Sequence, residues 1–453
     1  MRRSRNQFIA EFVLISCFSY LIFRPNIIPI FIVNIILIMK RISFLLLYSL
    51  LFLGSLTQAQ TKTYSILIKG GHVIDAKNNI NELMDVAIQA GKIAAVAKNI
   101  DPSLATQIVD AKGMYVTPGL IDLHAHVFAG TDDRGLSGGF SSLAPDPYTF
   151  RSGVTTVVDC GGAGWQSFDK FKKNIIDRSR TRVLSFLNIV GEGMRGNPYE
   201  QDINDMDAKK SADKALANKD IVVGFKLAHF AAASWVPVER VVEAGKLANM
   251  PVIIDFGGDN THAPLSIETL FNKYLRPGDI YTHVYTELVQ RDPVVDLNTR
   301  QLKPFLIPAQ KRGIIFDVGF GGGSFNFNQA IPSIKAGFLP NTLGTDLHTG
   351  SMNGAMKDQL NVLSIFLSMG MDIPGVISRS TWGPAQAIKR PELGNLSVGA
   401  GADVAVLTVR NGNFAFKDIS GNKNEGKQRF ECEMTIRNGR IVYDLNAIAS
   451  TPQ

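Results

Sequence analysis

Two histidines one residue apart, His124 and His126, are the side chains of this sequence best suited to bind a metal ion. The run from Val116 to Val127 that contains them is apolar, rich in β-forming residues and opened by a Pro-Gly turn, which predicts a buried strand. Side chains two positions apart point to the same face of a strand, so both imidazoles converge on one point, as ligands of a divalent ion do. The alternative is a pair of hydrogen-bonded interior histidines. Only seven histidines occur in the chain, and others follow later predicted strands, which favours the metal interpretation.

A lysine at position 226 interrupts the apolar sequence Val-Val-Gly-Phe-Lys-Leu-Ala of another predicted strand. A buried ammonium group is unfavourable unless it is paired or neutralised, although a long side chain can also extend its charged end into solvent. Near a pair of metal-binding histidines, a buried lysine can also be modified to become a metal ligand. A neutral Lys226 can react with CO2 to form a carbamate, an anionic oxygen ligand able to bridge two ions.

The ends of two later predicted strands carry further candidates. The segment Ile-Tyr-Thr-His supplies a third metal-binding histidine, His283, and the segment Thr-Asp-Leu-His supplies Asp346 and His348. Asp346 is suited to bind a metal ion through one oxygen and to accept a proton from the activated water through the other. His348 shares the face of Asp346, where it either contacts substrate or is a loop residue without a role. Arg195, in the loop after the third predicted strand, and Tyr285 are further candidates for contact with substrate.

These side chains require a scaffold that brings the ends of several strands together. The middle of the chain alternates apolar, strand-like segments with amphipathic, helix-like segments. The strand-like segments are 118–127, 154–161, 182–191, 221–230, 251–257, 280–286, 314–319 and 342–348, and the helix-like ones include 166–179, 205–218, 236–249 and 266–274. Such β/α units over about 270 residues predict a (β/α)8 TIM barrel, in which functional side chains lie at the carboxyl ends of the strands. A doubly wound sheet is disfavoured, because its glycine-rich nucleotide fingerprint should follow the first strand and the glycines at 321–323 come too late.

Short strand-like segments with Gly and Asn-Gly turns occur on both sides of the barrel region. Residues 61–117 and 391–447 share this pattern, which is typical of small β-structures. We therefore expect an α/β protein in which a composite β-sandwich, formed from both ends of the mature chain, accompanies a TIM-barrel domain at 118–390.

Residues 1–60 have the composition of a leader rather than of a folded domain. A Lys-Arg pair after Met39 precedes an apolar stretch and a small-residue segment around Ala59, which matches the charged, apolar and cleavage regions of a signal peptide. We expect translation to start at Met39, with 1–38 a mis-called start, and the mature protein to be exported, in a bacterium to the periplasm. The competing interpretation is a membrane anchor at 8–38, which an arginine and two prolines within that stretch disfavour.

Most of the net charge of +7 belongs to the predicted leader, which holds six of the 47 Lys and Arg residues and one of the 40 Asp and Glu residues. The rest of the chain is close to neutral, so the sequence offers no basic patch for nucleic acid. We expect membrane association only through an uncleaved leader. Beyond the leader the cysteines are Cys160 and Cys432, which are too few for a disulfide framework.

Taken together, the motifs resemble those of the amidohydrolase superfamily over about residues 64–446. They comprise PGLIDLHAH ending at His126, the strand lysine Lys226, His283, TDLH ending at His348, and PELGNLSVGAGADVAVL at 391–407. Within the superfamily, the stretches RPGDIYTH and TDLHTGSMNG are similar to the dihydroorotase-like amidohydrolase/deacetylase group.

This resemblance implies a binuclear metal site, usually with zinc. By position, His124, His126 and Asp346 would hold one ion, and a carbamylated Lys226 would bridge it to the second.

One position departs from the pattern of the group. Relatives usually have a histidine at the end of strand five, where this chain reads PVIIDFGG and places Asp255. Carboxylate oxygen is a competent ligand for zinc and a better one for manganese. Asp255 therefore replaces the histidine, or His262 reaches in from the following loop, or the second site is weak or empty and Lys226 stays unmodified.

We expect a metal-dependent hydrolase that cleaves an amide bond of the N-acyl or deacetylase type, or an acyl ester, through a metal-activated hydroxide. Asp346 would accept the proton and deliver it to the leaving group. The expected substrate is a small molecule, first an N-acyl amino acid or related amide, and a homo-oligomer is compatible with the sequence. The alternatives are a peptidase or cyclic-amide hydrolase on the same scaffold and, in another class, a catalytically inactive metal-binding barrel, which the intact Asp346 disfavours.

Overall fold

The computed structural model describes residues 32, 35–43, 62–132, 135–255, 257 and 263–451. The chain divides into two units, residues 1–61 and 62–453. In the first unit, residues 35–43 are helical with exposed side chains. Among the described residues, no helix is both long enough and apolar enough to cross a membrane. The predicted cleavage region near Ala59 lies outside the described residues.

The second unit contains a parallel sheet that curls into a barrel. Its strands follow the order β12-β11-β10-β9-β8-β7-β6, so sequence neighbours pair in space. They are β6 (Leu120–Ala125), β7 (Val154–Gly164), β8 (Arg182–Asn188), β9 (Val222–Leu227), β10 (Val252–Ile254), β11 (Ile280–Tyr281) and β12 (Ile315–Phe316). Consecutive parallel strands joined by helices are the arrangement of a TIM barrel, which confirms the predicted fold.

The segment 342–347 closes the barrel between β12 and β6 without forming a regular strand. The Val318 N–H donates to the Thr342 carbonyl (3.2 Å) and the His126 N–H to the Leu347 carbonyl (2.8 Å), and parallel bridges join Asp317 to Thr342 and Ala125 to Leu347. The predicted eighth strand at 342–348 is therefore replaced by isolated bridges. The physical reason is the left-handed backbone of Asp346 (φ 54°), which interrupts extended geometry.

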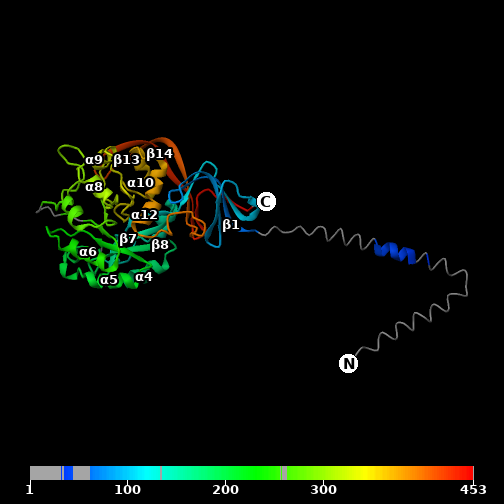
Figure 1. Cartoon of the computed structure of the whole chain (residues 1–453), viewed down its shortest axis with the longest axis horizontal. Helices are drawn as coiled ribbons and strands as arrows, with labels where there is room; N and C mark the ends of the chain where they lie inside the picture. Colours follow the sequence, from blue (N-terminus) through cyan, green and yellow to red (C-terminus); the bar gives the residue numbers. More distant parts are fainter. Residues whose placement is uncertain are drawn as a thin grey trace, which may run out of the picture. The chain divides into compact units, whose positions relative to one another are not determined.

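Helices follow most of the barrel strands and bury one face each. In α6, for example, Val238, Val241 and Gly245 lie on the buried face, and Asn249 ends the helix in a left-handed conformation. Figure 1 shows α4, α5 and α6 along the outside of β7 and β8. The α-helices of this unit are α3 (Asp146–Thr149), α4 (Phe168–Asn174), α5 (Ala208–Ala217), α6 (Val236–Ala248), α7 (Ile267–Thr269), α8 (Leu306–Lys311), α9 (Phe327–Lys335), α10 (Gln359–Ser368), α11 (Ile373–Ser378) and α12 (Trp382–Ala387). Shorter turns are η1 (Pro102–Leu104), η2 (Phe150–Ser152), η3 (Ile176–Arg178), η4 (Tyr199–Gln201), η5 (Ile203–Asp205) and the π-helical η6 (Leu270–Tyr274).

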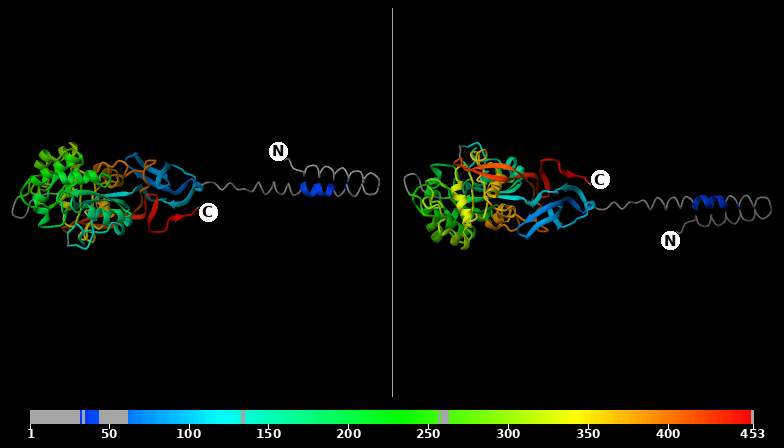
Figure 2. Two further views of the ribbon diagram at one scale, coloured as in Figure 1. Left: turned by 90° about the horizontal axis from the view of Figure 1, so that it is seen from below. Right: turned by 90° about the horizontal axis from the view of Figure 1, so that it is seen from above.

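A second, mixed sheet draws its strands from both ends of the same unit (Figures 1 and 2). Its order is β15-β14-β13-β5-β1-β2-β3, with β4 pairing β1 and β16. The strands are β1 (Tyr64–Asp75), β2 (Ile80–Gln89), β3 (Lys92–Ala97), β4 (Ala105–Asp110), β5 (Tyr115–Pro118), β13 (Val404–Lys417), β14 (Lys423–Arg437), β15 (Arg440–Asp444) and β16 (Ala449–Ser450). This arrangement agrees with the expected composite β-sandwich.

Hydrogen bonds attach the sheet to the barrel at several places. Between β5 and β6 the Gly119 N–H donates to the Asp403 carbonyl (2.8 Å). The hairpin of β13 and β14 also reaches helix α10, where the Phe430 N–H donates to the Ser364 hydroxyl (3.0 Å). The two cysteines of this unit, Cys160 and Cys432, are buried and free.

Candidate metal centre

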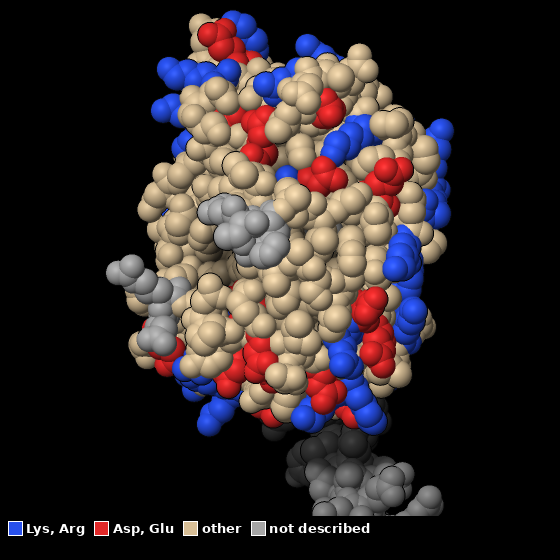
Figure 3. Space-filling view, turned by 90° about the vertical axis from the view of Figure 1, so that its left-hand side faces the viewer, with Lys and Arg blue, Asp and Glu red and all other residues tan. Residues whose placement is uncertain are grey.

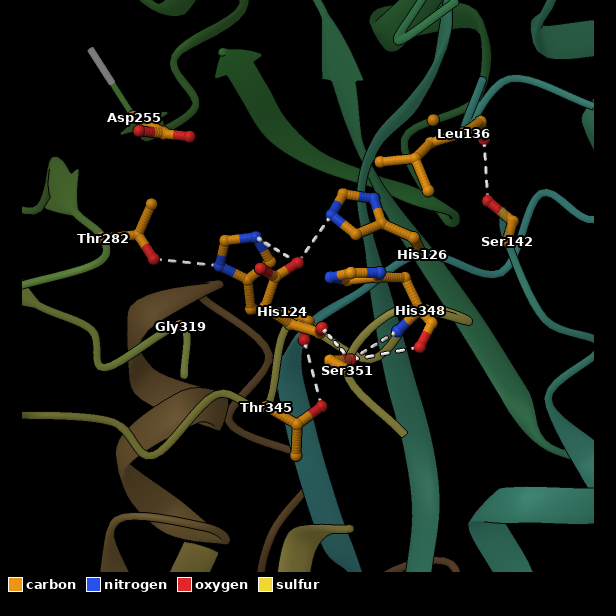
Figure 4. A network of polar contacts seen from close by, with 12 residues as sticks. His124, His126, Leu136, Ser142, Asp255, Thr282, Gly319, Thr345, His348 and Ser351 are labelled. Carbon is orange, nitrogen blue, oxygen red and sulfur yellow. Dashed lines mark hydrogen bonds and ion pairs between the residues drawn. The ribbon is translucent and has the colours of Figure 1, made fainter. Parts of the chain in front are cut away.

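Side chains from the ends of β6 and β11 and from the closing segment converge in the barrel. The ligand atoms of His124, His283 and Asp346 all lie within 4.8 Å of one another, and all three side chains are buried. Asp346 Oδ1 is 2.9 Å from His126 Nε2 and 3.6 Å from His124 Nε2. Figure 4 shows the imidazoles of His124 and His126 side by side, with Thr282 on the far side of His124. This geometry groups three histidines around one carboxylate.

A chain of hydrogen bonds holds the outer side of His124. Its Nδ1 lies 2.9 Å from the Thr282 hydroxyl, which in turn donates to Asp317 Oδ2 (2.7 Å). Asp317 Oδ1 also accepts the Thr342 hydroxyl (2.6 Å) and the Gly344 N–H (3.1 Å). This network places the proton of His124 on Nδ1 and leaves Nε2 as a lone-pair donor toward Asp346, as metal-binding histidines require.

The electrostatic surroundings keep both kinds of ligand ready to bind a cation. Burial, together with the charge of Lys226, lowers the pKa of His124 from 6.5 to about 3, so its imidazole is neutral. Burial alone would raise the pKa of Asp346, but His124 and His126 hold it well below its usual value. A neutral imidazole beside an ionised carboxylate is the protonation state that metal binding needs.

Backbone and neighbouring side chains fix Asp346 from several directions. Its N–H donates to the His124 carbonyl (2.6 Å) and its carbonyl accepts the Ser351 hydroxyl (2.8 Å). A Cβ at Gly321 would lie 2.4 Å from Asp346 Oδ2, so only glycine leaves room for the carboxylate there. The run of glycines at 321–323, which comes too late in the sequence for a nucleotide fingerprint, therefore borders the centre.

Asp122 lies behind these ligands rather than among them. Its carboxylate accepts the Thr345 N–H (3.0 Å), the Thr345 hydroxyl (2.5 Å) and the His124 N–H (3.2 Å). Burial raises the pKa of Asp122 to about 7 despite these bonds. Its contacts tie the start of the closing segment to β6.

Lys226 is buried in β9 with 1 % of its surface exposed, and among the described residues its Nζ has no hydrogen-bond partner. Gly161 makes room for it, since a Cβ there would lie 2.6 Å from Lys226 Cγ. An isolated buried ammonium group is strongly unfavourable. Three histidines, a carboxylate and an orphaned buried lysine beside them form a donor set that fits divalent metal ions.

Asp255 occupies the end of β10 and faces His283. Asp255 Oδ2 is 3.3 Å from His283 Nε2 and 3.7 Å from His229 Nε2, whereas Oδ1 is 2.7 Å from Arg291 Nη2. Burial would raise the pKa of Asp255, but Arg291 and His283 hold it well below its usual value. The sequence left open whether Asp255 or His262 reaches the second metal position. The structure places Asp255 at the centre, in contact with His283. His262 lies outside the described residues.

The predicted substrate-contact residues have different surroundings. The ring of His348 lies 6.3 Å from that of His126, and its Nδ1 accepts the Gly350 N–H (3.0 Å). Arg195 pairs with Glu192 (3.1 Å) in the loop after β8, and its guanidinium covers the ring of Tyr199.

Tyr285 is not brought to the centre. It is fully buried, its hydroxyl donates to the Phe338 carbonyl (3.3 Å), and its ring packs against Phe325 and Phe366. These core contacts use both the ring and the hydroxyl, so the predicted contact of Tyr285 with substrate is not supported.

Several residues of the centre were not identified from the sequence. Asp317 could have been recognised as Lys226 was, because it is a charged residue in a predicted apolar strand. Arg291, Glu200 and Thr282 lie in segments whose spacing indicates no chemistry, and His229, a lone histidine near the end of the predicted strand 221–230, gives only a weak signal.

Three residues around the centre adopt the left-handed backbone conformation, which is unfavourable for every residue except glycine. They are His229 (φ 56°), His283 (φ 55°) and Asp346 (φ 54°). Each such residue costs on the order of 1–3 kcal/mol, and such strain gathers at functional sites. The fold thus keeps an unfavourable backbone conformation at the residues whose side chains point into the centre.

The end of the unit seen in Figure 3 has mainly uncharged side chains in its middle, and charged side chains gather toward the edge of that view. A cavity of about 370 Å³ includes Thr345 and Leu347 of the closing segment in its lining. It lies beside the segment that carries Asp346.

Comparison with known proteins shows that the chain is similar in sequence and fold to hydrolases. No family profile matches the chain. A deacetylase from Agrobacterium fabrum is 31 % identical over 358 residues, which are 76 % of this chain and 83 % of the relative. Among solved structures, an adenine deaminase (TM-score 0.75, 25 % identity, 84 % of this chain and 100 % of its own) and a dihydroorotase (TM-score 0.73, 28 % identity, 84 % and 99 %) share the fold.

Proposed function

This chain belongs to the dihydroorotase-like deacetylase group of the amidohydrolase superfamily, and on that basis we propose that its substrate is an N-acyl amino acid or a related amide, with an acyl ester as the alternative. The chain is a metal-dependent hydrolase of C–N bonds, as its relatives indicate. The observation that carries the proposal is the convergence of His124, His126 and Asp346 beside the orphaned Lys226.

We propose that His124, His126 and Asp346 would hold one divalent ion, that His283 and Asp255 would hold a second, and that Lys226, as a carbamate, would supply a further oxygen ligand. Histidine nitrogens with carboxylate oxygens favour zinc, and manganese is the alternative that the two carboxylates support. Bound ions of this kind would supply Lewis-acid activation of water and of an acyl carbonyl.

The chain's own residues provide the proton transfer. Asp346 is ionised because its neighbours hold its pKa well below the usual value, so at neutral pH its carboxylate can accept a proton from the attacking water. The free Oδ of Asp346 then delivers that proton to the leaving nitrogen or oxygen. Burial of the centre excludes bulk water from this transfer.

Activity against a substrate panel tests the proposal. The zinc-loaded protein is assayed with N-acetyl amino acids, dipeptides, acyl esters, dihydroorotate and adenine, and Asp346→Asn serves as the control. Turnover of N-acyl amino acids that the substitution abolishes is expected. Preference for dipeptides or cyclic amides would identify the alternative hydrolase, and no turnover by either protein would support an inactive metal-binding barrel.

Metal analysis and carbon NMR test the proposed ions and carbamate separately. We expect two zinc ions per chain and, after incubation with 13C-bicarbonate, a carbamate carbonyl signal that Lys226→Met removes. A zinc-containing protein without that signal would leave the hydrolase assignment standing and remove the carbamate.

We also propose that the protein is exported through the leader at 39–59. Sequencing the amino terminus of the native protein is expected to show a start just after Ala59. A mature chain that retains residues 1–38 would contradict export by this signal.

A further inference from the structure

We propose that His229 is a third ligand, beside Asp255 and His283, of the second divalent ion. This inference rests on the proposed function, because it assumes that the centre binds two ions. It concerns a histidine that the sequence resemblance does not include among the ligands. Four features of the described residues carry it.

First, two histidine nitrogens lie near the same carboxylate oxygen on the Arg291 side of the centre. Asp255 Oδ2 is 3.3 Å from His283 Nε2 and 3.7 Å from His229 Nε2. These separations are close to those between neighbouring ligand atoms around a zinc or manganese ion, whose bonds measure about 2.0–2.2 Å. Each nitrogen is therefore close enough to Asp255 Oδ2 to share an ion with it.

Second, the outer atom of each of the three side chains is already bonded. His283 Nδ1 donates to the Gly319 carbonyl (2.6 Å), and Asp255 Oδ1 accepts from Arg291 (2.7 Å). His229 Nδ1 faces Glu200 Oε2 at 2.7 Å. Metal-binding histidines characteristically donate their other ring nitrogen to a carboxylate or carbonyl. The outer bonds thus direct Nε2 of both histidines and Oδ2 of Asp255 inward.

Third, two loops are joined so that His229 keeps this orientation. Glu200 is only 3 % exposed, and its Oε1 accepts the Gly196 N–H (2.7 Å). The adjacent Gln201 donates to the His229 carbonyl (2.8 Å) and accepts the Ala231 N–H (2.9 Å). This set of bonds links the loop after β8 to the loop after β9.

Fourth, the exposure of the His229–Glu200 pair is uneven. The side chain of His229 is 48 % exposed, whereas that of Glu200 is 4 % exposed. An imidazole that is held by a buried carboxylate and is open on its other side remains accessible to a ligand. The left-handed backbone of His229 (φ 56°) adds strain that a merely structural histidine would not need.

The decisive experiment measures metal binding rather than catalysis. His229→Asn and Glu200→Gln variants are compared with the full-length wild-type protein and with His72→Gln, a matched histidine control. His72 lies on β1, where its Nε2 bonds Asn81 (2.7 Å). Zinc content is determined by elemental analysis at buffered free zinc, and Co(II) titration follows the visible absorption of each equivalent.

We expect two ions in the wild type and in His72→Gln. In His229→Asn the first ion should bind normally, while the affinity for the second falls at least tenfold and its Co(II) spectrum changes. Glu200→Gln should weaken the second ion by about 10–100-fold, the usual effect of losing a carboxylate behind a metal-binding histidine. Circular dichroism establishes that each variant is folded, and if His229→Asn fails to fold, Glu200→Gln alone decides.

Three outcomes overturn the inference in distinguishable ways. Wild-type affinity and an unchanged Co(II) spectrum for the second ion in both folded variants would show that His229 is not a ligand. A wild type with one ion would remove the second position and leave the proposed hydrolase intact. A wild type that binds no ion would contradict the proposed function as well.

Discussion

Arg291 and Asp255 form a mostly buried ion pair at the centre, with Arg291 Nη2 2.7 Å from Asp255 Oδ1 and side-chain exposures of 13 % and 5 %. Removing one partner of such a pair leaves an uncompensated buried charge, which costs about 3–5 kcal/mol. We therefore predict that Arg291→Gln lowers the free energy of unfolding of the metal-free protein by about that amount. Urea denaturation measures it.

The double variant Asp255→Asn/Arg291→Gln provides the control for this pair. It should be more stable than Arg291→Gln alone, because no charge is left unpaired. Lys209→Gln, in an exposed pair with Asp213, should leave the urea midpoint unchanged. Strictly additive effects of the two substitutions at 255 and 291 would show that the pair is not coupled.

Asp317 should control the zinc affinity of the first ion without touching it. It holds the Thr282 hydroxyl that contacts His124 Nδ1, so Asp317→Asn loosens the orientation of that imidazole. We predict that affinity falls by about 10–100-fold, measured by competition with a chromophoric chelator. Asp296→Asn, an exposed acid that bonds only its own turn, should bind zinc like the wild type. Equal affinities would exclude an orienting role for Asp317.

Removal of metal should destabilise the protein. A ligand that binds only the folded state stabilises it by about 4 kcal/mol at a thousandfold excess over its dissociation constant. Calorimetry before and after chelation is therefore expected to show a lower unfolding temperature, restored by added zinc. Asp346→Asn, which lacks a ligand carboxylate, should show a smaller difference. Identical temperatures with and without chelator would contradict tight binding.

Lys226→Met should have opposite effects on stability and on metal content. In the metal-free protein the substitution replaces an ammonium group without a described partner by an apolar side chain of similar length. The free energy of unfolding should rise by about 1–3 kcal/mol, while zinc content at saturation falls. Lys246→Met, on the exposed side of α6, should change neither. A destabilised Lys226→Met would show that the ammonium is well accommodated.

The lowered pKa of His124 should make the free energy of unfolding depend on pH. Burial lowers its pKa in the folded, metal-free protein from 6.5 to about 3. Between those values the unfolded chain binds a proton that the folded chain does not, so stability falls as pH falls from 6.5 toward 3. The slope from this residue is at most about 1.4 kcal/mol per pH unit. Metal-free His124→Gln should show a shallower decline, and parallel curves would contradict the shifted pKa.

The barrel and the closest ligands were predictable because they depend on local pattern. Alternating apolar segments indicate β/α units, and the spacing of His124 and His126 indicates a shared face. Partners such as Glu200 and Arg291 were not predictable, since they reach the centre from loops whose paths depend on tertiary contacts. The eighth strand was predicted at 342–348 but does not form as a regular strand, for a related reason. The sequence around Asp346 is compatible with a strand, and only the contacts of Asp122 and Ser351 hold it in another conformation.

The left-handed residues His229, His283 and Asp346 set a limit on how this protein can be stabilised. Glycine at any of these positions would relieve backbone strain, yet it would also delete a side chain of the centre. Selection for thermal stability alone would therefore favour variants that have lost function. Screens for more thermostable variants of this protein need a measurement of metal binding at every round.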